Sequence, residues 1–349
     1  MKVSRLFTPL PVGSLILPNR LVMAPMALDH GTEQGEVTDS LISHYALRAK
    51  VDPLLDESGN WEKGRAGIGL LLLEHTFVNR SGKVHPRQLG IECDDQMEGL
   101  RKLTERIHRE GALIGIQLSH GGARTMEHPL APSPFHSPYL SRFGHIKDEE
   151  IPRELSSGEI GGLVKDFARA ATRSREAGFD LIEIHGAHGY LLNQFYSPLT
   201  NRRKDRYGGC LEKRLRLAVE VISAVKEAVG PGIPMAYRLG ADDRLPGGIT
   251  LDDSKRAIPC LLDAGADILD ISGGLCGYLK NGPEGFFSYM TEQLSSLSTV
   301  PLVTTGGIRS PEVAEKLVSD QKADLIGIGR AMLNDPGWAC KAWHTLTTG

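Results

Sequence analysis

The chain has 349 residues, of which 40% are apolar and 24% are charged. A chain of this size and composition can bury a substantial core, in one large domain or in two ordinary ones. The 40 basic and 43 acidic side chains give a formal net charge of -3, so electrostatics offers no reason to expect a nucleic acid or an anionic membrane as partner. We therefore expect a small-molecule substrate.

The five cysteines are widely scattered and include no C-x-x-C pair, a pattern that indicates no metal or iron–sulfur site. An odd, sparse count favours reduced thiols and a cytoplasmic setting. Pro9, Pro11 and Pro18 interrupt the apolar N-terminal stretch and no small-residue cleavage site follows, which argues against a signal peptide. No apolar run approaches the length of a membrane span, so no membrane partner is expected.

Short apolar runs recur along the chain, separated by stretches with helical periodicity, and this alternation is typical of a parallel sheet built from βα units. The runs are residues 21–26, 68–74, 112–118, 180–184, 234–239, 268–271, 301–305 and 325–328, and amphipathic helices are expected at 96–110, 158–177, 211–229 and 252–264. Eight such strands predict an α/β protein with a single (β/α)8 TIM barrel over residues 1–349. A doubly wound open sheet ranks second, because no G-x-G-x-x-G follows the first strand.

Two long connections, residues 121–155 and 273–299, follow strands and would therefore emerge on the catalytic face of a barrel. Their aromatic residues either line a substrate pocket or pack the loops onto the barrel. These residues are Phe135, Tyr139, Phe143, Tyr278, Phe286 and Phe287. The polar stretch 51–63 separates the first helix from the second strand and is expected as a solvated surface insertion on the opposite face.

Glycines end the last two predicted strands, as Gly306-Gly307 and as Gly329 followed by Arg330. Backbone N–H groups without a neighbouring side chain can approach a phosphate closely, and Arg330 adds positive charge. The loops after strands 7 and 8 are the recurrent phosphate site of such barrels. Either glycine loop taken singly is more often structural, since glycine also ends a strand tightly.

Two polar residues at other strand ends suit a flavin ring. Gln117 supplies both a donor and an acceptor for a flavin pyrimidine edge. Arg238 lies inside an apolar run and is costly to bury without an anion, which a reduced flavin would provide. The alternative for Arg238 is a structural ion pair with a neighbouring acid such as Asp242.

His185 and His188 lie three residues apart after the fourth strand, so both imidazoles can converge on one carbonyl oxygen, and Tyr190 offers a phenolic proton. The same spacing fits a metal pair. A zinc site needs at least a third ligand, however, and no carboxylate or cysteine is conspicuous beside the two histidines. Flavin chemistry therefore ranks above metal binding.

These residues resemble the old yellow enzyme family of flavin oxidoreductases, in particular its bacterial ene-reductase branch and the flavin domain of 2,4-dienoyl-CoA reductases. The similarity covers nearly the whole chain. It is strongest at residues 185–195, H-G-A-H-G-Y-L-L-N-Q-F, and at residues 203–209, which read R-x-D-x-Y-G-G. The resemblance implies tightly bound, non-covalent FMN with NAD(P)H as the reductant.

The resemblance also implies roles for individual residues. His185 and His188 would hold a substrate carbonyl, and Tyr190 would protonate the substrate. Arg238 would contact the N1 side of the isoalloxazine. The candidate cofactor contacts as a whole are Pro25, Met26, Ala27, His75, Gln117, Arg238, Gly273, Gly306, Gly307, Gly329 and Arg330.

The chain departs from the family pattern in three places. Ala27 stands where relatives often place a Cys or Thr against the flavin, so a hydrogen bond that tunes the redox potential is expected to be absent. His75 takes a flavin-facing position usually held by a small residue. The chain ends at Gly349 without the aromatic and arginine-containing tail of some dimeric relatives, so a homo-oligomer is possible but not implied.

We therefore expect ping-pong reduction of the activated C=C bond of an α,β-unsaturated carbonyl compound, with hydride drawn from NAD(P)H through FMN. Two alternatives stay open. One is the dehydrogenation of an amine or another small molecule. The other is a flavin-binding sensor or partner subunit with little activity, which Ala27 and His75 favour slightly.

Overall fold

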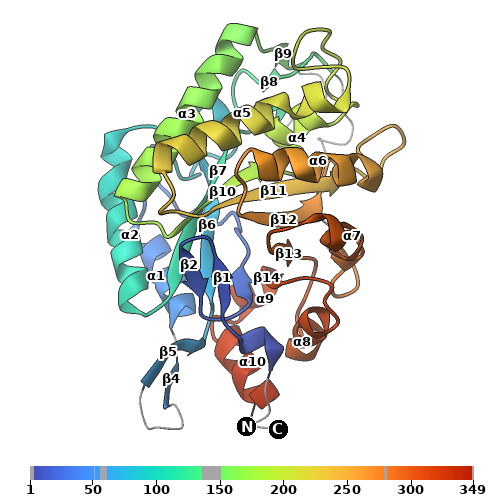
Figure 1. Cartoon of the computed structure of the whole chain (residues 1–349). Coiled ribbons are helices and arrows are strands. Elements are labelled where there is room, and N and C mark those ends of the chain that lie inside the picture. Colours follow the sequence, from blue (N-terminus) through green and yellow to red (C-terminus); the bar gives the residue numbers. More distant parts are fainter. Residues whose placement is uncertain (1–3, 51, 56–60, 136–150, 279–280, 348–349) are drawn as a thin grey trace.

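Residues 4–50, 52–55, 61–135, 151–278 and 281–347 are described in the computed structural model. Eight parallel strands form a closed barrel in which each strand pairs with the next and the last pairs with the first (Figure 1). They are β3 (Leu21–Met23), β6 (Leu70–Phe77), β7 (Leu113–Ser119), β10 (Leu181–Gly186), β11 (Met235–Asp242), β12 (Ile268–Gly273), β13 (Leu302–Thr304) and β14 (Leu325–Ile328). Each predicted run overlaps one of these strands, so the barrel prediction is confirmed and the open sheet is ruled out.

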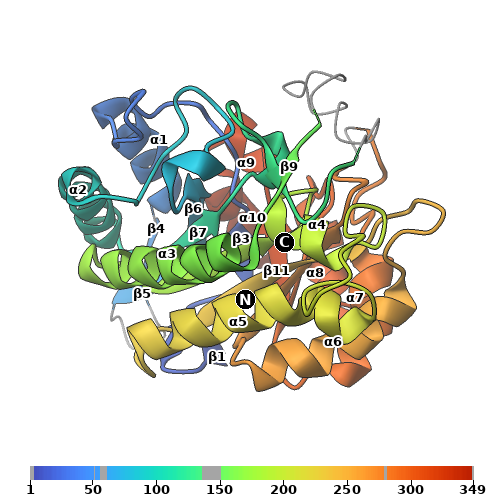
Figure 2. The same ribbon diagram turned by 90° about the horizontal axis from the view of Figure 1, so that it is seen from above.

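Helices surround the barrel, as the view from above shows (Figure 2). The four helices expected from periodicity are present with ends within one residue of the prediction: α2 (Met97–Arg109), α3 (Ser157–Glu176), α5 (Leu211–Val229) and α6 (Leu251–Asp263). Helix α3 begins where it does because Ser156 accepts from the backbone N–H of Glu159, whose carboxylate accepts from the N–H of Ser156. The remaining helices are α1 (Asp39–Ala49), α4 (Leu191–Tyr196), α7 (Ser288–Leu294), α8 (Pro311–Ser319), α9 (Arg330–Asn334) and α10 (Trp338–Thr347).

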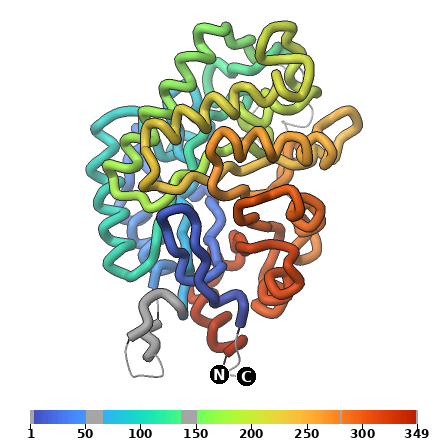
Figure 3. The backbone as a smooth tube through the Cα atoms, in the orientation of Figure 1, coloured from blue at the N-terminus to red at the C-terminus, as the bar shows by residue number. Residues whose placement is uncertain are grey.

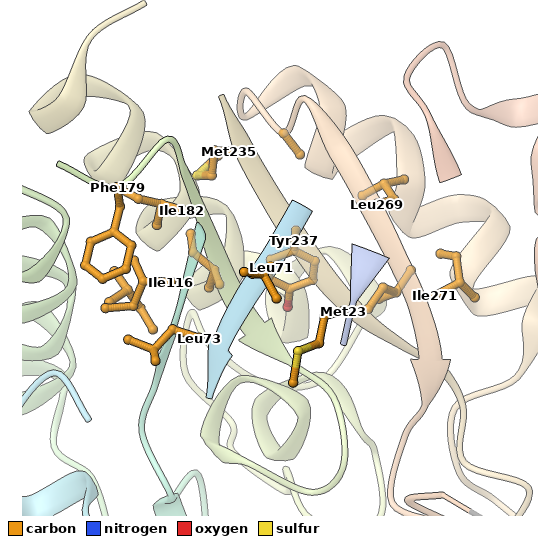
Figure 4. Close-up of a cluster of buried hydrophobic side chains, with 14 of the residues drawn as sticks. Met23, Leu71, Leu73, Ile116, Phe179, Ile182, Met235, Tyr237, Leu269 and Ile271 are labelled. Carbon is orange, nitrogen blue, oxygen red and sulfur yellow. The ribbon is translucent and has the colours of Figure 1, made fainter. Parts of the chain in front are cut away.

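Successive side chains of each strand point alternately toward the helices and into the barrel. Ile116, Ile182 and Leu269 belong to the large cluster between strands and helices, part of which is drawn in Figure 4. Leu181 and Ile268, one residue away on their strands, belong instead to a separate cluster inside the barrel. The runs are apolar throughout because both faces of each strand are buried.

A hairpin of β1 (Leu10–Val12) and β2 (Leu15–Leu17) closes the N-terminal end of the barrel. Val12 and Leu17 join the cluster inside the barrel. The first and last described segments also meet there, where the backbone trace brings the blue and red ends of the chain side by side (Figure 3). The ring of Phe7 lies 5.0 Å from that of Trp343 in an edge-on contact. This end of the barrel is therefore filled by side chains and serves stability.

The predicted insertion at 51–63 overlaps an antiparallel pair, β4 (Asp52–Leu55) and β5 (Trp61–Ala66), whose second strand runs three residues beyond the predicted bound. The pair projects on the side of the molecule where the chain ends lie (Figure 1), beside α10. Residues 51 and 56–60 lie outside the described part of the chain.

The long connection after β7 is anchored at two points by one side chain. Arg203 Nη1 donates to the carbonyl oxygens of Pro132, at 2.9 Å, and Leu155, at 2.6 Å. The same guanidinium pairs with Asp205, and a Cβ on Gly208 would lie 2.3 Å from the carbonyl oxygen of Arg203. The R-x-D-x-Y-G-G segment therefore holds a loop in place.

The aromatic residues of the two long loops have different environments. Phe287 is buried in the large core cluster and Phe286 contacts it edge-on at 4.5 Å, so these two pack their loop onto the barrel. Phe135 is buried in a separate cluster of loop residues that includes Leu275. Tyr278 is 50% exposed. Tyr139 and Phe143 lie outside the described residues. Among the helices that are described, none has the length and apolar character needed to cross a membrane.

Candidate functional site

Polar side chains replace apolar ones inside the barrel toward the C-terminal ends of four neighbouring strands. On β10, Glu183 and His185 follow Leu181 at alternate positions, so all three point inward. By the same alternation Arg238 follows Ala236 on β11, and Asp270 follows Ile268 on β12. Gln117 on β7 stands in register with Glu183. The barrel thus carries a polar layer directly above its apolar one.

The three candidate catalytic residues lie together. The ring of His185 is 5.2 Å from that of His188 and 4.5 Å from that of Tyr190, measured between centroids. His185 is buried, and its Nδ1 has no hydrogen-bond partner among the described residues. Because a buried polar atom normally has a partner, Nδ1 is available to a ligand.

His188 adopts a backbone φ of 57°, in the left-handed region that side chains other than glycine rarely enter. Its N–H donates to the carbonyl oxygen of Gly273 at 3.1 Å, and its Nε2 lies 2.7 Å from the hydroxyl oxygen of Ser272. These two contacts with the end of β12 hold the residue in that conformation and orient its ring.

Burial sets the protonation states of these residues. It lowers the pKa values of both His185 and His188 well below their usual range, and the positive charge of Arg238 lowers them further. Burial raises the pKa of Tyr190, although the nearby Arg124 acts in the opposite direction. Near neutral pH the imidazoles are therefore uncharged, and the phenol keeps its proton.

Arg124, in the loop after β7, was missed in the sequence analysis. Its guanidinium carbon lies 4.6 Å from the centroid of the Tyr190 ring, and its Nη1 donates to the carbonyl oxygen of His188 at 2.8 Å. A basic residue two positions after the Gly121-Gly122 pair was the signal in the sequence that could have revealed it.

Arg238 has an acidic partner, but not the one considered from the sequence. Its Nε lies 3.1 Å from Asp270 Oδ2, close enough for an ion pair although without hydrogen-bond geometry. Asp242 instead accepts from the N–H of Arg244 and from the hydroxyl of Tyr289. Arg238 therefore does lie beside an acid, as the alternative reading of the sequence proposed. The acid is Asp270, because it stands in register with Arg238 on the neighbouring strand.

Glu183 and Asp270 are the other residues that sequence reasoning missed. Both are 1% exposed, and Gln117 Nε2 donates to Glu183 Oε1 at 2.7 Å. The signal was present in the sequence, since each acid interrupts an apolar strand run just as Arg238 does.

His75 lies beside the catalytic cluster, with its ring 5.4 Å from that of Tyr190. Gln88 accepts from the N–H of Val84 through Oε1 and presents Nε2 to His75 Nδ1 at 2.8 Å. Nδ1 must therefore act as acceptor, which places the imidazole proton on Nε2. Burial lowers the pKa of His75 to about 3, so the ring is neutral.

The loop after β3 carries Pro25 and Met26, which are partly exposed, and Ala27, which is exposed. Glu74 fixes this loop by accepting a hydrogen bond from the backbone N–H of Leu28. Burial raises the pKa of Glu74 to about 7. The expected absence of a hydrogen bond from residue 27 to the flavin stays a prediction.

The candidate phosphate loops follow the neighbouring strands β13 and β14. Gly306 and Gly307 have φ values of 128° and 68°, which require glycine. A Cβ on Gly329 would lie 2.9 Å from the Met26 sulfur, so the loops after β14 and β3 approach closely, and Arg330 is exposed. A Cβ on Gly273 would meet the carbonyl oxygen of residue 277 at 2.1 Å, so this glycine is needed for packing.

Known proteins resemble this chain along nearly its whole length. The model of the NADH:flavin oxidoreductase / NADH oxidase family matches residues 5–348. An NADH oxidase from Thermoanaerobacter brockii is 37% identical over 97% of this chain and 50% of its own length. An NADPH dehydrogenase from Bacillus subtilis is 34% identical over 99% of this chain and 96% of its own length.

Among solved structures, an old yellow enzyme homologue from Zymomonas mobilis is similar with a TM-score of 0.78 and 28% identity, over 95% of this chain and 90% of that one. The resemblance inferred from residues 185–195 and 203–209 is thus confirmed. The chain spans about half the length of the Thermoanaerobacter relative and nearly all of the Bacillus one.

Proposed function

Because the chain belongs to the NADH:flavin oxidoreductase / NADH oxidase family, we propose that it reduces the activated C=C bond of an α,β-unsaturated carbonyl compound. Membership in the family makes the protein a flavin oxidoreductase that uses FMN with NAD(P)H as reductant, as the sequence predicted. The substrate class, the residue roles and the order of steps belong to the proposal. So does the activity of the whole protein, because one relative is twice as long.

The residues present suit FMN. Arg238 Nε is buried without hydrogen-bond geometry to any described partner, and Gln117 is 2% exposed beside Glu183. A flavin pyrimidine edge offers donors and acceptors to both groups. Met26 would contact the ring, and Gly307, Gly329 and Arg330 would hold the phosphate.

The chemistry that FMN supplies when bound is hydride exchange, first with NAD(P)H and then with the substrate. His185 and His188 would donate hydrogen bonds to the substrate carbonyl oxygen and so polarise the double bond. An uncharged imidazole still carries one N–H, so each ring can donate one hydrogen bond to that oxygen. Tyr190 would deliver its phenolic proton to the α-carbon. The observation that carries this assignment is the buried Nδ1 of His185, which has no partner among the described residues and belongs to a ring that neighbours those of both His188 and Tyr190.

The proposal is tested in two anaerobic steps. The FMN-loaded protein is reduced with a stoichiometric amount of NADPH or NADH and then mixed with a cyclic enone. The flavin absorbance should return, and the saturated ketone should appear as product. The matching saturated ketone serves as the control substrate, because it offers the same oxygen but no double bond.

The same absorbance measurement separates the alternatives. Reduction of the oxidised protein by an amine would indicate a dehydrogenase instead. If the enone does not oxidise the reduced protein and the amine does not reduce the oxidised protein, the result would indicate a sensor or partner subunit and would contradict the proposed activity.

A further inference from the structure

Four polar side chains without a catalytic role in the proposed reaction lie on consecutive strands inside the barrel, and one of them, Arg238, stands in register with His185. Gln117 on β7 stands in register with Glu183 on β10, and Arg238 on β11 stands in register with Asp270 on β12. Their exposed fractions are 2%, 1%, 6% and 1%. Two acids and one base thus occupy a space from which solvent is excluded.

The contacts among these four side chains require that one of the two acids carries a proton. Gln117 Nε2 donates to Glu183 Oε1 at 2.7 Å, and Arg238 Nε faces Asp270 Oδ2 at 3.1 Å. The carboxyl groups of Glu183 and Asp270 are within hydrogen-bond reach of each other. Ionised carboxylates only accept hydrogen bonds, so one member of the pair must carry a proton. Asp270 Oδ1 has no other partner among the described residues and suits the acceptor role.

The charges decide which group is protonated. An ionised Asp270 beside Arg238 forms a neutral ion pair, whereas a second carboxylate would leave one buried negative charge uncompensated. Burial and the neighbouring Asp270 both raise the pKa of Glu183, and the hydrogen bond between the two acids acts in the same direction. For Asp270 burial also raises the pKa, while Arg238 and the hydrogen bond from Glu183 lower it. Glu183 is therefore the proton donor of the pair.

We propose that Glu183 and Asp270 share one proton and act as positioning residues that set the orientation and charge of Gln117 and Arg238 toward the pyrimidine side of FMN. Glu183 accepts a hydrogen bond from the side-chain amide of Gln117 and so fixes the orientation of that amide. Asp270 holds the guanidinium of Arg238 and screens its charge. The proposal rests on FMN binding, which is one part of the proposed function, and not on enone reduction.

The shared proton has a consequence for the redox potential. Reduction of FMN adds negative charge, which Arg238 favours and a second carboxylate would oppose. The charged groups that face Glu183 are Asp270 on β12 and Arg238 on β11, so the proton on Glu183 decides whether the cluster is neutral or negative. Loss of this proton at alkaline pH should weaken the binding of reduced FMN relative to oxidised FMN.

The first test looks for the proton itself by infrared spectroscopy. Near neutral pH the parent protein should show the C=O stretch of a protonated carboxyl group that Glu183→Gln lacks. Glu315→Gln is the matched control. Burial alone would raise the pKa of Glu315, but hydrogen bonds from Ser4 and from the backbone of Leu6 and Arg5 lower it, so its carboxyl is ionised. Identical carboxyl bands in the parent and Glu183→Gln would overturn the shared proton.

The second test measures the midpoint potential of bound FMN against pH. Since the pKa of Glu183 is raised to about 8, the potential of the parent should fall more steeply above that pH than the potential of Glu183→Gln, whose amide cannot ionise. Asp270→Asn removes the screening of Arg238, so reduced FMN should bind about tenfold more tightly relative to oxidised FMN, a shift of about 30 mV for a two-electron couple.

A purely structural role predicts a different outcome. The affinities for oxidised and reduced FMN would then fall together and the potential would not move, which would contradict the positioning role. If Asp270→Asn does not fold, the test relies on Glu183→Gln alone. This variant should fold, because glutamine can still donate a hydrogen bond to Asp270 and accept one from Gln117. Neither readout uses an enone, so failure of the proposed activity would leave these results unaffected.

Discussion

Arg124 lies over the ring of Tyr190, with 4.6 Å between the guanidinium carbon and the ring centroid. The same guanidinium donates to the carbonyl oxygen of His188 at 2.8 Å. One cation therefore ties the loop after β7 to the motif after β10 and lowers the pKa of the phenol that burial raises. Arg124 thus bears both on the geometry of the motif and on the acidity of Tyr190.

We expect Arg124→Met to slow the oxidation of reduced enzyme by an enone. A cation over an aromatic ring contributes about 0.5–2 kcal/mol, which corresponds to roughly a 2- to 30-fold change in rate. The optimum of this half-reaction should also move to higher pH, because the pKa of Tyr190 rises. Stopped-flow traces of both half-reactions measure the effect. Arg124→Lys keeps the charge and should lie closer to the parent; equal rates in both variants and the parent would show that the cation has no influence on Tyr190.

Tyr190→Phe separates the two half-reactions. The ring and its contacts with His185 remain, but the proton is lost, and a positioned general acid is worth on the order of 10²–10⁴ in rate. Enone reduction should slow by about that factor, while reduction of the flavin by NAD(P)H stays nearly unchanged. Quinones, which need no protonation at carbon, serve as the control substrate. If Tyr190→Phe reduced enones as fast as the parent, the proton would have to come from another residue or from water.

The histidine pair should be visible in ligand binding without turnover. Phenols bound over the oxidised flavin should give a long-wavelength charge-transfer band whose titration yields a dissociation constant. His185→Ala and His188→Ala should each weaken binding by about 1–3 kcal/mol, because one hydrogen bond to the ligand oxygen is lost. His108→Ala removes a histidine outside the barrel and should bind like the parent. Unchanged affinity in both site variants would refute the roles assigned to them.

The buried histidines make stability sensitive to acid. Burial lowers the pKa of His120 from 6.5 to about 3. A folded-state pKa below the unfolded value means that the stabilisation is complete above pH 6.5 and is lost as pH falls toward 3. Each such histidine contributes a slope of about 1.4 kcal/mol per pH unit where only the unfolded state is protonated.

We therefore expect His120→Asn, whose amide can still accept from the N–H of Gly122, to lose less stability between neutral and acidic pH than the parent. Urea unfolding at several pH values measures the difference. Glu74 and Glu183, whose folded-state pKa values are raised, act in the opposite sense in both proteins and cancel in the comparison. Asp180 raises the pKa of His108 by hydrogen bonding, so His108→Asn should change the slope in the opposite direction. Parallel stability curves for the parent and His120→Asn would contradict the account.

The local sequence pattern was sufficient to predict the barrel strands and four of its helices. The periods of the apolar runs predicted eight strands and four helices, because a strand buried on both faces and an amphipathic helix each leave a regular trace in the sequence. The spacing of His185, His188 and Tyr190 predicted that they lie together, since the end of β10 and the turn that follows it place the three within six consecutive residues. The contacts of His188 with the end of β12 then fix its conformation.

The partners of those residues were decided by the tertiary structure. Arg238 meets Asp270 and not Asp242, and Arg124 reaches Tyr190 across 66 positions of sequence. The pairing of Arg238 depends on which inward positions of neighbouring strands share a level, and that level is set by the stagger with which eight strands close into a barrel. The contact of Arg124 depends on how the loop after β7 packs against the segment after β10. A period of two along one strand carries no information about the register of the next, so no reading of single segments could have brought these side chains together.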